Sequence, residues 1–468
     1  MSNENSPIGG QQSTSVQLQK ATLKSSRTPT SIDLTSVVVE LSMFENLARP
    51  FITGYLALID SERIIENFDI QGAEEIEIIF RRSTERATVR EIKQNWIIQN
   101  IEREHNVQDF TSVVVLRLID KESFRSGLKN VNKCLQGQPW EILNQVLIEY
   151  LDRDDLRTSA DLNNSETMKV IVPNMTPIET TQWIRNRSIN QNGYPFYFYK
   201  TAMTNQYHFA DLETLISNPV INENAPLSPN QAGGSTESKS TTSTIYDMEQ
   251  GDVDNLYRLI RQGIIGSENR YYDVTRGDFD IVPFNVNNDV LAELQTLNTR
   301  QEKPLLDGRL KFDDDAISNY KAKVVSQISG ANVYDDVKSY DETQDIGDSR
   351  KKIKAHAIRN LMEKSPISIM VEGDRWIHGD RHYGVGNNIK VLVRSKADDP
   401  NNPSVDRKQS GDYLIITGKY VLDFSKGKVG ATFKCAKFGN YQSDAYNLGT
   451  GGILSLIHIS EPTRPLEI

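Results

Sequence analysis

The stretch from Ser365 to Lys434 begins SPISIMVEGD, in which Ile367, Ile369 and Val371 alternate with other residues up to a Gly-Asp break. The same alternation recurs in four further segments, at 389–393, 410–416, 420–424 and 429–433. Period-two alternation with Gly or Asp at the breaks indicates consecutive antiparallel strands. No gap in the stretch has room for a crossover helix, so we expect a meander that closes into a barrel or a sandwich.

The order of these segments resembles the second tube-forming barrel of central baseplate hub proteins from contractile-tailed phages. The related hubs of type VI secretion spikes share it. The common pattern is I-x-I-x-V-x-G, a Gly-rich approach to an apolar strand, S-G-x-Y-L-I and a strand that ends in Phe. Those hubs usually have a V-G-D turn, whereas this chain has Val385-Gly386-Asn387. Asn adopts turn conformations similar to those of Asp, so we expect the turn to be kept.

A second strand-rich block, Ile32 to Lys129, resembles the first tube barrel of the same family. Its last strand, Thr111 to Ile119, is apolar on both faces, which predicts burial on both sides. Gly72 and Glu75 could mark a site, but turn chemistry and a solvated charge explain them better. The positions that match the family pattern are Phe51, Gly54, Leu56, Leu58, Asp60, Ile70, Gly72, Glu75, Ile76, Ile78 and Phe80.

Between these blocks, the order of helix, strand, helix and aromatic hairpin resembles the small α/β domain inserted into the first barrel of phage hubs. The helices are expected at 139–154 and 177–188, and Thr176 with Glu179 predicts a capping box on the second. The hairpin strands at 194–200 and 207–211 are rich in Tyr and Phe. They could stack nucleic-acid bases. No Lys- or Arg-rich groove accompanies them, which favours a buried core or a trimer contact.

The sequence therefore predicts an α+β, mainly β protein with two tube-type antiparallel β-barrels and inserted small α/β and helical domains. A basic helix is expected from Gly347 to Glu363, and the residues from about 454 resemble translated sequencing-adapter sequence. The predicted parts are a flexible N-terminal arm at 1–31, a first barrel at 32–130, an inserted α/β domain with a return strand to the first barrel at 131–221, a linker at 222–244, the start of a second barrel at 245–284, a helical or irregular insertion at 285–364, the remainder of the second barrel at 365–440 and a tail at 441–468.

Composition limits the function. The 468 residues include 53 basic and 63 acidic ones, a formal net charge of −10, which argues against a protein that grips nucleic acid by charge. Two distant cysteines, Cys134 and Cys435, do not make a disulfide framework and fit a reducing compartment. The polar N-terminus lacks the apolar region of a signal peptide. No apolar run approaches the roughly 20 residues of a membrane span.

The best candidate for chemistry is the pair His378 and His382, with Asp374 and Asp380 nearby. Two His four residues apart share a face only on a helix, and the surrounding glycines break helices. The Gly384-x-Gly386 motif precedes a strand, unlike a dinucleotide fingerprint. The acidic run at 313–315 lacks the Gly and distal Glu of a calcium loop. We therefore expect no catalytic, metal-binding or cofactor-binding residues, and no enzyme activity.

By resemblance, the chain is expected to be a structural baseplate hub of a phage contractile tail, located in the virion and assembled in the host cytoplasm. Its implied partners are two further copies in a pseudo-six-fold homotrimer, the tail tube protein, the central spike protein and other baseplate proteins. DNA would pass through a neutral or negative lumen without specific binding. A virion-associated peptidoglycan hydrolase and a spike hub of a contractile secretion system remain the alternatives.

Overall fold

The computed structural model describes residues 16–440 apart from 28, 62, 83–89, 109–110, 160–166, 230–242, 252–254, 274–276, 293–302, 305, 307, 330–345, 395–404, 407 and 438. The chain is α+β and mainly β, as the sequence predicted. The predicted foreign tail from about 454 lies outside the described residues. No described helix is long and apolar enough to cross a membrane.

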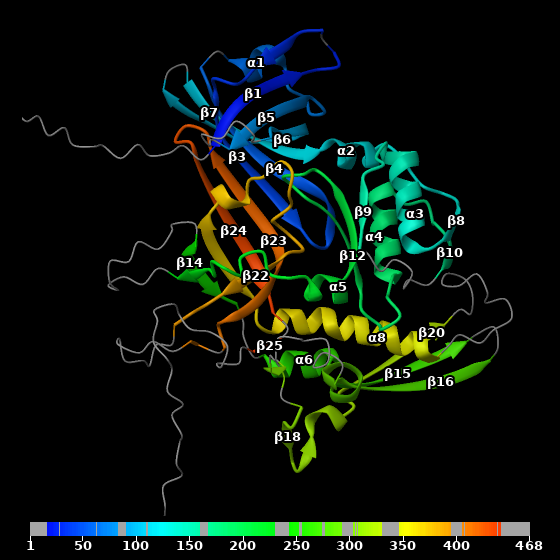
Figure 1. The fold of residues 1–468 in the computed structure, drawn as a ribbon. Helices are drawn as coiled ribbons and strands as arrows, with labels where there is room; N and C mark the ends of the chain where they lie inside the picture. Colours follow the sequence, from blue (N-terminus) through cyan, green and yellow to red (C-terminus); the bar gives the residue numbers. More distant parts are fainter. Residues whose placement is uncertain are drawn as a thin grey trace, which may run out of the picture.

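A 13-stranded sheet forms the centre of the molecule (Figure 1). Its strand order is β13-β14-β21-β24-β23-β3-β4-β7-β6-β5-β1-β2, and β22 pairs with β23 beside this path. The strands are β1 (Val16–Lys24), β2 (Ser31–Asp33), β3 (Val38–Asn46), β4 (Arg49–Asp60), β5 (Glu75–Arg82), β6 (Ile92–Gln108), β7 (Thr111–Asp120), β13 (Ser228–Pro229), β14 (Thr244–Gln250), β21 (Ile367–Glu372), β22 (Asn388–Val391), β23 (Gly411–Asp423) and β24 (Lys428–Ala436).

The sheet contains one strand arrangement twice. In the first repeat, β3 to β7, the spatial order is β3-β4-β7-β6-β5. In the second repeat, β14 and β21 to β24, it is β14-β21-β24-β23-β22. Both are the first, second, fifth, fourth and third strands of their repeat, and every neighbouring pair is antiparallel. The two halves of the central sheet therefore share one strand topology.

The repeats do not form two separate barrels. The first part of β23 pairs with β22, and its second part pairs with β3, from Thr417 opposite Asn46 to Asp423 opposite Glu40. This junction makes one continuous sheet, and no closed barrel is present among the described strands. One hydrophobic core runs beneath both repeats, with Leu56 and Leu116 from the first repeat and Ile369 and Phe433 from the second.

Two predicted boundaries are wrong. The arm at 1–31 includes β1, which pairs with β5 and buries Ala21 and Leu23 completely. Lys20 and Lys24 of the same strand form ion pairs with Glu77 on the solvent side. The sequence of β1 is therefore polar on average, although one face of the strand packs on the core. The linker at 222–244 begins with ordered chain, because Asn222 is buried and bonds both backbone groups of Lys390 in β22. The return segment of the inserted domain therefore meets the second repeat rather than the first.

The inserted α/β domain has its own core. Thr176 caps α4 through the predicted capping box with Glu179. In the aromatic hairpin the Phe196 and Phe209 rings stack at 4.6 Å and both are buried, so these aromatics serve the core. The domain comprises α2 (Lys121–Gly127), β8 (Cys134–Gly137), α3 (Pro139–Val146), a π-helix (Leu147–Leu151), β9 (Leu156–Thr158), β10 (Met168–Ile171), α4 (Pro177–Arg187), β11 (Phe196–Lys200), β12 (Tyr207–Asp211) and α5 (Leu212–Ser217).

Residues 256–361 form a further module rather than barrel strands followed by an irregular insertion. β15 pairs with β16 and with β20. These three strands form a small sheet that is separate from the central sheet. The predicted basic helix is α8, which lies between this small sheet and the inserted domain (Figure 1). The module comprises α6 (Leu256–Gln262), β15 (Gly266–Asp273), β16 (Asp278–Asn285), a π-helix (Asn287–Leu291), β17 (Lys303–Pro304), β18 (Lys311–Phe312), β19 (Asp315–Ala316), a 3-10 turn (Ile317–Asn319), β20 (Lys323–Ser329) and α8 (Ile346–Leu361).

Four short elements complete the chain. They are α1 (Ile64–Phe68), 3-10 turns at Met362–Lys364 and Asp374–Trp376, and β25 (Gly439–Asn440), which pairs with β17.

Candidate functional site

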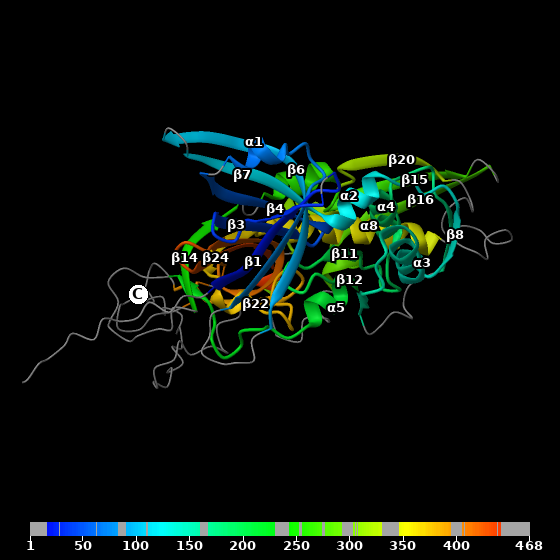
Figure 2. The same ribbon diagram turned by 90° about the horizontal axis from the view of Figure 1, so that it is seen from above.

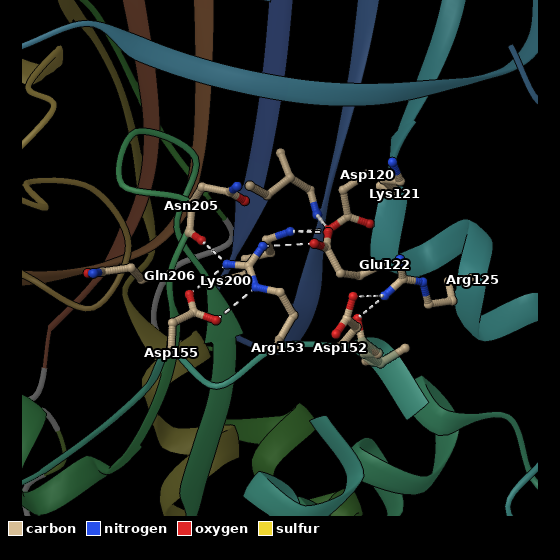
Figure 3. A network of polar contacts seen from close by, with 12 residues as sticks. Asp120, Lys121, Glu122, Arg125, Asp152, Arg153, Asp155, Lys200, Asn205 and Gln206 are labelled. Atoms are coloured by element: carbon tan, nitrogen blue, oxygen red, sulfur yellow. Dashed lines mark hydrogen bonds and ion pairs between the residues drawn. The ribbon is translucent and has the colours of Figure 1, made fainter. Parts of the chain in front are cut away.

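A buried charged cluster fixes the inserted domain to the first repeat (Figure 3). Lys200 of β11 lies at its centre with a side chain only 1% exposed, 2.9 Å from Asp120 and 2.7 Å from Glu122. Arg153 holds the other oxygen of Glu122 at 2.7 Å and also binds Asp155. Asp120 ends β7 and caps α2 through the N–H of Ser123. The cluster therefore ties the end of a sheet strand to three segments of the inserted domain.

Each charged group of this cluster lies beside a group of opposite charge. Burial alone would raise the pKa of Glu122, but Lys200 and Arg153 beside it lower that pKa to about 2. Burial also raises the pKa of the Tyr207 hydroxyl, and the carboxylates of Asp120 and Glu122 raise it further. Buried ion pairs are stable only when each charge has partners, which is the arrangement here. The cluster can hold two parts of the chain in a fixed position.

A second polar junction is built on Glu45 of β3, which is 2% exposed. Its carboxylate accepts hydrogen bonds from the N–H of Ala202, the N–H of Val385 and the hydroxyl of Tyr420, each at 2.8 Å. These donors belong to the inserted domain, the Gly-rich loop and β23. One carboxylate thus joins three distant segments, and a Cβ at Gly384 would collide with it. The close approach of Glu45 therefore requires glycine at position 384.

Three rings pack beside this junction. Tyr199 stacks on His208 with centroids 5.1 Å apart, and His208 lies 5.4 Å from His382. Burial lowers the pKa of His208 to about 3, helped by His382 and Arg157. Burial also lowers the pKa of His382, whose Nε2 contacts the carbonyl of Val385. Both imidazoles are therefore neutral near pH 7 and serve as packing groups.

The candidate metal ligands do not converge. His382 is buried in the ring cluster, whereas His378 accepts a hydrogen bond from the N–H of Asp380 at 3.2 Å. Asp374 binds Arg82 at 2.9 Å, and Asp380 binds Arg90 at 2.7 Å. Within the described residues, no group of three His, Cys, Asp or Glu side chains is placed to hold a metal ion.

The two other motifs are turns. Gly386 has a φ of 86°, which favours glycine, and a Cβ there would collide with the Tyr199 hydroxyl. Asp313 and Asp314 form the hairpin turn between β18 and β19, with φ values of 48° and 70°. Asp tolerates this left-handed conformation, so the acidic run is turn chemistry.

Two long strands of the central sheet, β6 and β14, each have one edge that the described strands cover only in part. β5 covers one edge of β6 from Ile92 to Ile97, and no described strand pairs with that edge from Gln99 to Gln108. The β6–β7 hairpin projects beyond the rest of the sheet (Figure 2). β14 pairs with β21 along one edge, but β13 covers its other edge only at Thr244 and Ile245. Open edges offer unpaired backbone N–H and C=O groups to another chain.

The sheet face opposite the core is apolar on β7, which pairs with β6, and on β4 beside it. On β4, Phe51 and Tyr55 are half-buried and Ile59 is 42% exposed. On β7, Val113 and Val115 are half-buried on the same face, because each lies opposite an outward-facing residue of β4. The prediction that β7 is buried on both sides is therefore wrong for the single chain. The apolar residues on both faces of β7 were visible in the sequence, but they do not show what covers the outer face.

Comparison of the sequence with protein families and with curated proteins found no match. Comparison of the fold with solved structures found phage tail proteins and secretion components. A tail protein from Neisseria meningitidis MC58 matches 90% of this chain and 96% of its own at 9% identity, with a TM-score of 0.51. The 43 kDa tail protein of prophage MuSo2 from Shewanella oneidensis matches 90% and 98% at 9% identity, with a TM-score of 0.49. An E. coli type VI secretion component matches 91% and 78% at 10% identity, with a TM-score of 0.41. The chain thus has the fold of the Neisseria tail protein.

Proposed function

We propose that this chain is the structural baseplate hub of a contractile tail. Three copies form a ring that joins the tail tube to the central spike in the virion, and the protein acts without catalysing a reaction. The partners are two further copies, the tail tube protein, the spike protein and other baseplate proteins. The fold shared with a tail protein supports this proposal, but the observation that carries it is the doubled strand arrangement with its open edges.

The chain contains a pattern for the contact between copies. Within one chain, the outer part of β23 in the second repeat pairs with β3, the first strand of the first repeat. The equivalent of β23 in the first repeat is β6, and the equivalent of β3 in the second repeat is β14. Both of these strands have an edge that the described strands leave partly open. If β6 of one copy pairs with β14 of the next, two repeats in each of three copies close a six-membered ring.

The direction of the β14 backbone allows a sharp test. The N–H of Gly251 donates to the carbonyl of Pro366 at 3.0 Å, so that N–H faces β21. Antiparallel pairs alternate along a ladder, so the N–H of Glu249 also faces β21 and that of Gln250 faces the open edge. Gln250→Pro removes one outward donor and places a ring on the edge. Gln250→Ala keeps the donor and is the matched control.

Light scattering across a concentration series gives the mass in solution. We expect trimers for the native chain and for Gln250→Ala, and monomers for Gln250→Pro at the same concentrations. Thermal unfolding of the dissociated chains should be similar. A trimer that survives Gln250→Pro, or a native chain that stays monomeric at every concentration, would contradict the ring.

The channel is the second part of the proposal. DNA that slides through a tube must not be held by Lys and Arg contacts to phosphate. α8 packs on the module sheet and the inserted domain rather than on the central sheet, and its Lys354 is 7% exposed, which supports a position away from the channel. We expect the purified hub to retain little duplex DNA on filters at low salt. Tight retention that falls steeply with salt would contradict a neutral or negative lumen.

A further inference from the structure

Two arginines meet at the seam between the inserted domain and α8. Arg185 lies in the last turn of α4, and Arg359 lies in the last turn of α8. Arg359 forms a hydrogen bond with the hydroxyl of Tyr197 on β11. Burial lowers the pKa of Arg185, and the nearby charge of Arg359 lowers it further, to about 10. α4 packs on β11, and the Tyr197 hydroxyl of β11 contacts the sulfur of Met362 directly after α8 at 3.4 Å, so the ends of the two helices meet beside β11.

Neither arginine has a carboxylate partner among the described residues. The Nε of Arg185 and the Nε and Nη2 of Arg359 are buried and donate no hydrogen bond. The remaining contacts are weak: Arg185 reaches the carbonyl of Ala48 at 3.4 Å, and the Tyr197 hydroxyl donates to the sulfur of Met362 at 3.4 Å. Two like charges are thus held together without a counter-charge.

Two buried cations elsewhere in the described structure are paired with carboxylates. Lys200 lies between Asp120 and Glu122, and Arg153 lies between Glu122 and Asp155. An arginine does not lose its proton in proteins, so it cannot relieve burial by becoming neutral. Leaving a buried charge without an opposite charge is costly, so Arg185 and Arg359 would gain from an anionic partner.

The position at helix C-termini does not account for the pair. Cations are favourable in the last turn of a helix, most directly when they bond the terminal carbonyls. Arg187 does so, since its Nη1 donates to the carbonyl of Trp183 at 3.1 Å and its guanidinium stacks 3.8 Å above the Trp183 ring. No such bond to an α4 carbonyl is made by Arg185 in the described structure. The two neighbouring arginines of α4 therefore have different surroundings.

We propose that Arg185 and Arg359, with the hydroxyl of Tyr197, bind a small oxyanion, either a phosphate or a carboxylate group. Guanidinium groups present paired N–H donors that match the oxygens of both. The Tyr197 hydroxyl can turn from the weak sulfur acceptor to an anionic oxygen. Both arginines keep partial exposure, which gives a small ion access. All three residues belong to one chain, so the site does not depend on the ring.

The test uses the full chain and thermal unfolding. Sodium phosphate and sodium acetate are each compared with sodium chloride at equal ionic strength, for the native chain and for Arg185→Gln, Arg359→Gln and the control Arg187→Gln. We expect a saturable rise in Tm with phosphate or acetate for the native chain and the control. Either Gln variant at the site should need about tenfold more anion, because one charge-assisted contact is lost.

The comparison of phosphate with acetate distinguishes the two kinds of anion. A larger response to phosphate assigns a tetrahedral anion, and a larger response to acetate assigns a carboxylate such as a side chain of a bound protein. In chloride the two site variants should melt no lower than the native chain, since each removes an uncompensated charge. Equilibrium dialysis with labelled phosphate gives a second readout. Equal responses in all four proteins, or no response in the native chain to either anion, would overturn the proposal.

Discussion

The two repeats share a strand order but differ in how firmly the chain holds them. In the first repeat, both edges of β3 are paired and its Glu45 is buried at a junction of three segments. In the second repeat, β14 has one open edge and exposes Tyr246, Asp247 and Glu249. The same position in the topology is therefore interior in one repeat and surface in the other. The single chain therefore forms the pairing of β23 with β3, but not the equivalent pairing of β6 with β14.

The junctions inside the chain also differ from each other in charge. The Lys200 cluster consists of ion pairs between buried side chains. In the Glu45 junction, one carboxylate accepts hydrogen bonds from uncharged donors. The two histidines beside it have lowered pKa values and are neutral. Substitutions and pH should therefore affect the two junctions unequally, and the open edge of β14 least of all.

Replacing Lys200 with Met should have the largest effect. It removes the cation between Asp120 and Glu122 and leaves buried carboxylates with Arg153 as the remaining charged partner. Breaking a buried ion pair from one side costs about 3–5 kcal/mol of unfolding free energy. Urea unfolding followed by tryptophan fluorescence measures the loss.

The control for this variant is Lys121→Met. Lys121 lies next in sequence to the cluster, but it is 42% exposed and pairs with Glu75 at 3.1 Å. Exposed pairs contribute about 0–1 kcal/mol. Equal losses from both lysine substitutions would show that the cluster does not hold the inserted domain.

Glu45→Gln should have the next largest effect. The amide keeps one oxygen for Val385 and Tyr420, but its NH2 group then faces the N–H of Ala202. An unsatisfied buried donor costs about 2 kcal/mol. On β14, Gln250→Ala loses one half-buried hydrogen bond from Gln409, so at concentrations where the chains are monomeric it should cost only about 0.5–1 kcal/mol. A similar loss at both strands would remove the distinction between the closed and the open junction.

Local signals in the sequence predicted the elements well. The capping box at Thr176, the helix α8 and the alternating strands of both repeats depend on neighbouring residues, which the sequence displays directly. Pairing between distant strands has no such signal. The predicted second barrel therefore included β15 and β16, although β15 pairs with β20, whose Lys323 lies 56 residues after its partner Ser267.

The polar junctions were beyond sequence reasoning for a related reason. Glu45 is 157 residues from Ala202 and 340 from Val385, and nothing nearby in sequence distinguishes it from the exposed acidic residues. β1 was missed because four of its nine residues are Gln or Lys, and its buried apolar residues Val16, Ala21 and Leu23 do not alternate regularly along the strand. The open edges have no sequence signal at all, since openness depends on which strands are absent beside them.

The last prediction distinguishes the two junctions by pH. The folded-state pKa of His208 is about 3, below its ordinary value of 6.5, so the unfolded chain binds a proton first. Its contribution to stability is complete above pH 6.5 and is lost as the pH falls toward 3. Between pH 7 and pH 5 this loss is about 2 kcal/mol. The lowered pKa of His382 acts in the same direction.

The charged cluster responds in a lower window. The pKa of Glu122 is lowered from 4.5 to about 2, so its contribution stays intact above pH 4.5 and is lost only below it. His208→Phe keeps the stack on Tyr199 and removes the titrating group, whose Nε2 is buried without a hydrogen-bond partner. Urea unfolding at pH 7, 6 and 5 should therefore show a shallower pH dependence for this variant than for the native chain. If the pH dependence of the unfolding free energy is the same in His208→Phe and in the native chain, His208 is not the group that takes up the proton. The Glu45 junction would then be as resistant to acid as the Lys200 cluster.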